Sequence, residues 1–144
     1  MSSGCEMLKQ YLGQVCQELG IKSELALSSE GFYSVPFEET GAVEFKENED
    51  QSIFLQATCC SIPKNNTESY LTLIMKAHLF CKETGHAFFG IDGKEENLLL
   101  SLLLPPRLEY KGFYSELEDF LNYVDSWREE TLTFGEKDEE EKGA

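Results

Sequence analysis

The sequence has little positive charge. Among its 144 residues, 12 are Lys or Arg and 27 are Asp or Glu, which gives a formal net charge of −15 at neutral pH. Phosphate backbones and anionic membranes repel such a surface, and the sequence contains no local basic patch. We therefore expect neither a nucleic-acid nor a membrane partner. The same charge helps a protein that exposes apolar surface to stay dissolved.

Long apolar segments are also missing. The densest one, residues 98–104, is far shorter than the roughly 20 apolar residues of a membrane-spanning helix. The first residues lack a basic stretch followed by an apolar run, so no secretion signal is expected. The five cysteines are Cys5, Cys16, Cys59, Cys60 and Cys81. An odd number of cysteines without an export signal is typical of reduced thiols in a cytosolic protein.

Signatures of catalysis are equally scarce. The chain has two histidines, no G-x-S-x-G elbow and no G-x-x-x-x-G-K-[ST] loop, so neither a nucleophilic triad nor ATP binding is expected. A metal site at His78, Cys81 and His86 would lack a fourth ligand. Cys59 and Cys60 are adjacent on a predicted strand and should point to opposite faces. We therefore predict no enzyme, no cofactor and no metal site.

The sequence does contain a series of periodic segments, and the first, residues 5–20, predicts a helix. Its apolar stripe at helical spacing consists of Leu8, Leu12, Val15 and Leu19. Gly20 is expected to end this helix. The stripe is wide enough for two sets of contacts, so its members divide between the core and an exposed binding surface. Leu12, Val15 and Leu19 fit the core better.

Between residues 31 and 62 the apolar pattern changes from helical to alternating. Alternating runs over residues 32–37, 43–46 and 53–60 predict three strands. Acidic and glycine- or asparagine-containing turns separate these runs, which favours an antiparallel meander. Pro36 offers no amide to a sheet, so we expect it on an edge strand.

A second helix is predicted over about residues 67–83, and it is apolar on nearly every side. One side carries Leu71, Ile74 and Met75, and much of the remainder is apolar as well. A helix with this pattern must be covered almost completely. Because so small a domain rarely buries a helix on all sides, a second copy of the chain could supply the missing cover.

The last third of the sequence predicts strands at 87–91 and 98–104 and a helix at about 112–132, with Trp127 beside its apolar stripe. Residues 135–144 are acidic and predict a disordered tail. The order α-β-β-β-α-β-β-α predicts an α+β domain over residues 1–134, in which helices pack on a twisted antiparallel sheet. A doubly wound parallel sheet is not expected, because helices and strands do not alternate one by one.

Several short segments resemble one family, the class I type III secretion chaperones (CesT/SycE-like). The most specific are Leu79-Phe80, Glu83-Thr84-Gly85 and Phe89-Gly90-Ile91-Asp92. The opening helix that ends Leu19-Gly20-Ile21 supports the resemblance, which covers about residues 5–134. The family often has Asn just before the Leu-Phe pair, where this chain has His78.

The resemblance implies a cytosolic, ATP-independent chaperone from a Gram-negative bacterium. Its cargo would be the N-terminal region of a secreted effector, held extended along the first helix and the sheet, where a cargo strand can add to a free edge. The implied cargo-binding residues are Leu8, Tyr11, Leu12, Phe32, Phe45 and Phe54. The implied homodimer would form through Leu71, Ile74, Met75, His78 and Phe88. Each residue could instead be core, since the pattern does not say which face of the sheet the helices cover.

Two alternatives stay open on this basis. The chain could be an acidic regulatory adaptor that engages a transcription or secretion-apparatus component. It could also pair with a related chaperone rather than with itself, because the apolar cover of the second helix need not come from an identical chain.

Overall fold

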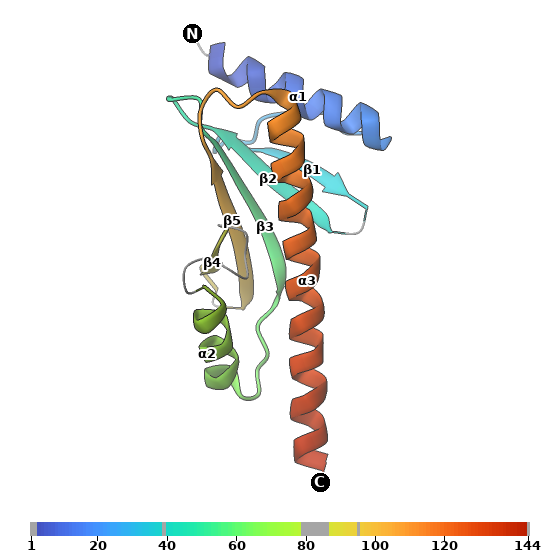
Figure 1. The fold of residues 1–144 in the computed structure, drawn as a ribbon, viewed down its shortest axis with the longest axis vertical. Coiled ribbons are helices and arrows are strands. Elements are labelled where there is room, and N and C mark those ends of the chain that lie inside the picture. Colours follow the sequence, from blue (N-terminus) through green and yellow to red (C-terminus); the bar gives the residue numbers. More distant parts are fainter. Residues whose placement is uncertain (1–2, 39, 79–86, 95, 144) are drawn as a thin grey trace.

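A computed structural model describes residues 3–38, 40–78, 87–94 and 96–143 (Figure 1). Its helices and strands follow the predicted order. They are α1 (Ser3–Leu19), β1 (Tyr33–Phe37), β2 (Gly41–Glu47), β3 (Ile53–Ser61), α2 (Thr67–His78), β4 (Phe88–Ile91), β5 (Asn97–Leu104) and α3 (Tyr110–Gly143). Helix α2 was predicted to reach residue 83, but residues 79–86 lie outside the described part of the chain, together with the Leu79-Phe80 and Glu83-Thr84-Gly85 segments.

The strands form one antiparallel sheet in the order β1-β2-β3-β5-β4. The predicted meander of the first three strands is therefore confirmed. Strand β1 lies at one edge of the sheet, so Pro36 is on an edge strand, as expected from its missing amide. Strand β4 forms the other edge.

Helices α1 and α3 cover one face of the sheet (Figure 1). Alternate strand residues point to this face and form the main core, among them Val35, Phe45, Leu55, Leu100 and Leu102. Helix α1 contributes Leu8, Leu12 and Val15, and α3 contributes Phe113, Leu117, Phe120 and Val124. Below this core, α2 packs on the sheet and on α3 through a smaller cluster that includes Tyr70, Ile74 and Trp127.

Helix α1 ends where Gly20 was predicted to end it. Gly20 has a φ of 68°, a backbone conformation that suits glycine. The Ile21 amide donates to the Cys16 carbonyl oxygen at 2.8 Å, and the Gly20 amide donates to the Gln17 carbonyl oxygen at 3.4 Å. These two bonds satisfy carbonyls at the helix end. Leu19, predicted to be core, is 47% exposed at the last position of α1.

Strand β3 contains a β-bulge that the sequence pattern does not reveal. Thr58 pairs with Leu99 of β5, and Cys60 pairs with Leu98. Cys59 is thus an extra residue on β3, which interrupts the alternation of side chains between the two faces.

The bulge turns both adjacent cysteines toward α3. Cys59 Sγ lies 3.5 Å from the Val124 carbonyl oxygen, and Cys60 Sγ lies 3.3 Å from Thr131 Oγ1. The prediction that Cys59 and Cys60 point to opposite faces is therefore wrong, because it assumed an uninterrupted strand.

Arg128 of α3 holds the bulge in place. Its Nε donates to the Cys59 carbonyl oxygen at 2.7 Å, and its Nη2 donates to the carbonyl oxygens of Thr58 at 3.2 Å and Thr40 at 2.9 Å. A single guanidinium thus joins the bulge to the turn between β1 and β2. The planar fork of donors on arginine suits this role.

Helix α3 extends beyond the predicted 112–132. The backbone is helical through Gly143, where the sequence predicts a disordered tail over 135–144. The segment is rich in Glu and Lys, which favour helices, and it contains no proline that would end one. In Figure 1, this end of α3 runs past the sheet.

Candidate functional site

Three of the six predicted cargo-binding residues have no exposed surface. Leu8, Leu12 and Phe45 are each 0% exposed and belong to the core between α1, α3 and the sheet. A partner cannot reach these side chains in this conformation. Leu8 and Leu12, which were expected to contact cargo, lie in the core because α1 lies across the sheet with these residues facing inward.

Tyr11 has a role in joining two helices. Its ring lies 5.5 Å from that of Tyr110 and 5.4 Å from that of Phe113, and its hydroxyl donates to the Leu108 carbonyl oxygen at 2.9 Å. These contacts fix α1 against the start of α3. The half-buried ring leaves only part of its surface for a cargo chain.

The other two predicted cargo residues lie on the outer face of the sheet, which α1 and α3 leave uncovered. Phe32 and Phe54 are in edge-on contact, with ring centroids 6.4 Å apart. Phe54 lies 6.4 Å from Phe88 of β4 and pairs with Leu103 of β5. We call Phe32, Phe54, Phe88 and Leu103 the outer row. Lys46 Nζ lies 5.4 Å from the centre of the Phe32 ring, which leaves a positive charge at one end of the row.

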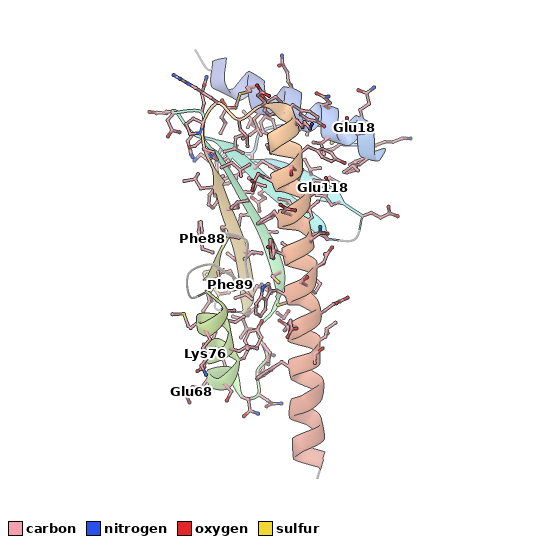
Figure 2. The ribbon with its side chains drawn as sticks, viewed as in Figure 1. Glu18, Glu68, Lys76, Phe88, Phe89 and Glu118 are labelled. Atoms are coloured by element: carbon pink, nitrogen blue, oxygen red, sulfur yellow. The ribbon has the colours of Figure 1, made fainter. Side chains whose placement is uncertain are left out.

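Phe88 belongs to this face because β4 alternates. Its neighbour Phe89 meets Trp127 of α3 at 5.2 Å, so Phe88 points the other way (Figure 2). Phe88 is 39% exposed and Leu103 is 54% exposed. The structure therefore brings Phe88, predicted for dimer contact, next to Phe54, predicted for cargo contact.

The predicted dimer residues on α2 also divide between core and surface. Ile74 is buried against the chain's own sheet and α3, whereas Met75 is 69% exposed and Leu71 is half-buried. Leu71 and Met75 line a shallow groove of about 440 Å³, which lies between Glu68 and Lys76 (both labelled in Figure 2). The side chain of His78 lies outside the part of the chain that the structure describes.

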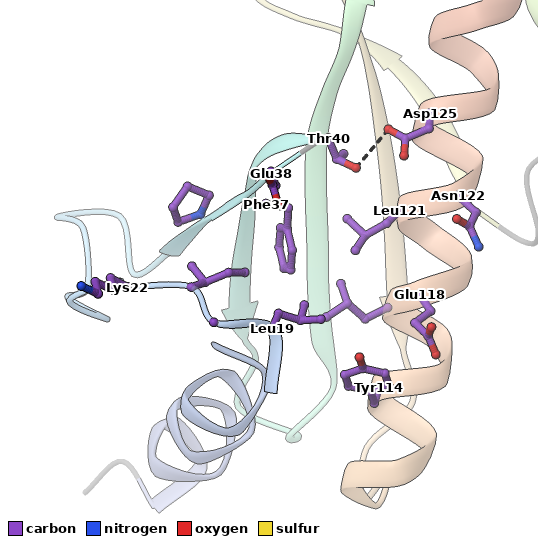
Figure 3. Close-up of a pocket in the computed structure, with 14 residues that line it drawn as sticks. Leu19, Lys22, Phe37, Glu38, Thr40, Tyr114, Glu118, Leu121, Asn122 and Asp125 are labelled. Carbon is purple, nitrogen blue, oxygen red and sulfur yellow. Dashed lines mark hydrogen bonds between the residues drawn. The ribbon is translucent and has the colours of Figure 1, made fainter. Parts of the chain in front are cut away.

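A larger groove of about 700 Å³ lies between the end of α1, the edge strand β1 and α3 (Figure 3). Its apolar lining includes Leu19, Phe37 and Leu121. The sequence does not reveal this groove, because its walls come from segments up to about a hundred residues apart and no local motif marks them. Leu19, which the sequence predicted as core, is one of its lining residues.

The polar lining of this groove is mainly acidic. It includes the carboxylates of Glu38, Glu118 and Asp125, against one ammonium group from Lys22. Thr40 Oγ1 donates to Asp125 Oδ1 at 3.0 Å, which ties α3 to the turn between β1 and β2 (Figure 3). An apolar floor with a negative rim favours a partner that presents apolar and basic side chains.

Metal-binding clusters and membrane-spanning helices are both absent from the described residues. No cluster of three or more His, Cys, Asp or Glu side chains with a geometry suited to a metal ion occurs among them. Cys81 and His86 of the candidate metal set lie outside the described part of the chain. Within the same described ranges, no helix has both the length and the apolar character needed to cross a bilayer.

Comparisons with known proteins agree with this architecture. A protein of Chlamydia pneumoniae designated CPj0713/CpB0740 is 30% identical over 122 residues, which cover 84% of this chain and 93% of the relative. The structure of the ExsC–ExsE complex matches with a TM-score of 0.66 at 20% identity, covering 87% of this chain and 93% of that chain. The HopA1–SchA chaperone–effector complex matches with a TM-score of 0.65 at 15% identity, covering 90% and 98%.

The structural matches confirm the predicted α+β fold with its three helices and open antiparallel sheet of five strands. The sequence model of the Tir chaperone protein (CesT) family matches residues 10–128, which is most of the chain. The chain therefore belongs to the Tir chaperone protein (CesT) family, whose members are effector-binding type III secretion chaperones and not enzymes.

Proposed function

We propose that this chain is a cytosolic chaperone of a Gram-negative bacterium that binds the N-terminal segment of a type III secreted effector. It keeps this segment extended and competent for secretion, without ATP. The observation that carries the proposal is the outer row, an apolar strip across β3, β5 and β4 that no helix of the described chain covers.

The outer row suits an extended peptide. Side chains of a cargo strand project alternately, so every second one can fit between the rings of Phe32, Phe54 and Phe88. Edge strands β1 and β4 lie at the two ends of the sheet and can pair with cargo main chain. A cargo that orders on binding needs a large contact area, and the face between the two edge strands offers it.

The acidic groove beside α1 is a second contact region in this proposal. A cargo chain that leaves the β1 edge can place an apolar side chain against Phe37 and Leu121 and a basic one near Glu118. Such charge complementarity helps to select the partner and to speed association. The high net negative charge of the chaperone acts in the same direction.

We further propose a homodimer that forms through α2. Met75 and the shallow groove beside it are the exposed apolar features of this helix, and a second copy would bury them. The alternative of a heterodimer with a related chaperone rests on the same surface. Light scattering during gel filtration distinguishes the two, since a chain that needs a different partner would be monomeric alone.

The test is co-purification of the full chain with the N-terminal segment of a secreted effector. The expected result is a stable complex that Phe54→Ser weakens about tenfold, because it removes the central ring of the outer row. Glu44 is exposed and pairs with Gln56 on the same face of the sheet. The control variant Glu44→Gln should leave binding unchanged. A monomeric chain that binds no such segment would contradict the proposal.

A regulatory adaptor is the second candidate, and the acidic groove favours it. In that case the chain should capture a transcription or secretion-apparatus component from cells that lack all effectors. Under our proposal this capture should be absent.

A further inference from the structure

The bulge in β3 brings two thiols together where α2 and α3 meet the sheet. Cys60 Sγ lies 3.5 Å from Tyr70 Oη of α2 and 3.3 Å from Thr131 Oγ1 of α3, and these two hydroxyls are 2.6 Å apart. Cys59 Sγ lies 3.5 Å from the Val124 carbonyl oxygen, and Cys59 is the chain neighbour of Cys60. All of these atoms belong to one contact between three elements.

The two thiols differ in their surroundings. The hydrogen bond with Cys59 lowers the pKa of the Cys60 thiol to about 6, against the effect of burial and with further help from the two hydroxyls and Arg128. The same hydrogen bond and burial raise the pKa of Cys59. Cys60 is half-buried, whereas Cys59 is 1% exposed. Cys16, another described free cysteine, is buried, and burial raises its pKa.

A partly accessible thiolate beside a second thiol is the arrangement found in redox-sensing proteins. We propose that Cys60 and Cys59 are such a pair, with Cys60 as the reacting thiol, Cys59 as the resolving thiol and a hydroperoxide as the oxidant. The pair would act as a modification site that controls how firmly α2 is held.

The chemistry has two steps. The Cys60 thiolate attacks one oxygen of hydrogen peroxide, so that an S–O bond forms, the O–O bond breaks and the leaving hydroxide takes up a proton to become water. The sulfur of Cys59 then attacks the sulfenic sulfur of Cys60. An S–S bond forms, the S–O bond breaks, and the hydroxyl leaves with the Cys59 proton as a second water. Two thiols lose two electrons in total, and the peroxide gains them.

The product cannot keep the geometry of the reduced bulge. Neighbouring Cα atoms are about 3.8 Å apart across a trans peptide, whereas disulfides favour roughly 4.4–6.8 Å. The backbone at Cys59 and Cys60 must therefore shift, and a bulge, where the ladder is already interrupted, allows this most easily. A strained disulfide is also readily reduced, which makes the change reversible.

The shift should loosen α2. It withdraws Cys60 Sγ from Tyr70 and Thr131, and it moves the Cys59 carbonyl away from Arg128. Tyr70 is fully buried and anchors α2 in its cluster. Any effect on pairing of two copies rests on the proposed function, but the thiol chemistry and the loosening of α2 do not.

The experiment treats the reduced full chain with hydrogen peroxide and follows thiols, masses and amide hydrogen exchange. We expect two of the five thiols to disappear, a peptide with a disulfide between Cys59 and Cys60, and full reversal by dithiothreitol. Amide exchange in Thr67–His78 should rise at least about threefold after oxidation. Within the same molecules, Cys16 should react more slowly than Cys60, a comparison that needs no variant.

Three variants sharpen the test. Cys59→Ser should trap a sulfenic acid at Cys60 that dimedone labels, and Cys60→Ser should abolish the fast reaction. Cys16→Ser is the matched control and should behave like the unaltered chain. The proposal is overturned if Cys16 reacts as fast as Cys60, if Cys60 pairs with Cys5, Cys81 or another chain, or if the disulfide forms and α2 exchange stays unchanged.

Discussion

The ring of Phe54 lies 6.4 Å from the ring of Phe88, although the two residues come from strands separated by β5 in the sheet. On the strand between them, Leu103 pairs with Phe54 and Ser101 pairs with Phe88. The ring contact makes one continuous apolar surface from positions that the sequence assigned to two different partners. The proposed cargo contact and the proposed dimer contact therefore meet at Phe88.

The Phe54–Phe88 contact predicts coupled effects on cargo binding. Phe54→Ser and Phe88→Ser should each lower the affinity for an effector segment about tenfold. The loss of affinity in the double variant should be smaller than the product of the two single losses, because each change already disrupts the shared ring contact. Titration calorimetry measures this cycle. If Phe88→Ser alters only the oligomeric state and leaves cargo affinity unchanged, then Phe88 belongs to the dimer contact alone.

Met75→Asp should separate the proposed dimer. Met75 is 69% exposed in the single chain, so the change should not disturb its folding, but it would place a charge in a buried apolar contact. Light scattering should report a monomer, with an unchanged circular dichroism spectrum. Thr133→Asp, an exposed change on α3, serves as the control. A dimer that survives Met75→Asp places the interface elsewhere.

Arg128→Lys should destabilise the chain although it keeps the charge. Lysine cannot reproduce the fork that binds the carbonyls of Thr40, Thr58 and Cys59. The expected loss is about 2 kcal/mol in the free energy of unfolding, measured by urea denaturation. The exposed Arg107→Lys should change it by less than about 0.5 kcal/mol. Equal effects of the two changes would show that the bulge does not depend on Arg128.

The surroundings of Glu47 predict that replacing its carboxyl group stabilises the chain in a way that depends on pH. Its Oε1 accepts from the Leu8 amide at 3.0 Å, but its buried Oε2 has no hydrogen-bond partner among the described residues. Burial raises the pKa of Glu47, while the Leu8 hydrogen bond opposes the shift. An acid with a raised pKa in the folded state favours folding when protonated. This contribution is lost as the pH rises through the folded-state pKa.

Glu47→Gln should therefore stabilise the chain at pH 7, by about 1 kcal/mol or less because the residue is only half-buried. The advantage should vanish below about pH 4, where the carboxyl of the unaltered chain is also neutral. Thermal unfolding at both pH values measures it. The exposed Glu44→Gln should show no such pH dependence. If Glu47→Gln raised the stability equally at both pH values, the charge of the Glu47 carboxylate could not be the cause.

Gly20 and Gly135 provide a matched pair of substitutions. Both have open space where a Cβ would be, but Gly20 has a φ of 68° and Gly135 lies within α3. Gly20→Ala should cost about 1 kcal/mol because alanine is strained in this conformation. Gly135→Ala should gain up to about 1 kcal/mol because alanine favours the helix. If both substitutions changed the free energy of unfolding in the same direction, this explanation of the α1 terminus would be contradicted.

The sequence alone predicts much of this fold because local chemistry decides it. Alternating and helical apolar spacing gave the order of helices and strands, and Gly20 and Pro36 marked a helix end and an edge strand. The acidic tail is helical in the structure, and its composition is compatible with both disorder and a continued helix. The family resemblance, confirmed by the match over residues 10–128, came from the same local patterns.

The tertiary structure decided which residues form the candidate surfaces. Alternation places Phe54 and Leu55 on opposite faces of one strand, but only the register with β2 and the packing of α1 and α3 show that Phe45 is core and that Phe54 is half-buried on the outer face. The bulge at Cys59 depends on pairing with β5, which lies some forty residues further along the chain. The acidic groove likewise needs α1, β1 and α3 together. Periodicity fixes the relative direction of neighbouring side chains, whereas their burial and register depend on contacts between segments that are distant in the sequence.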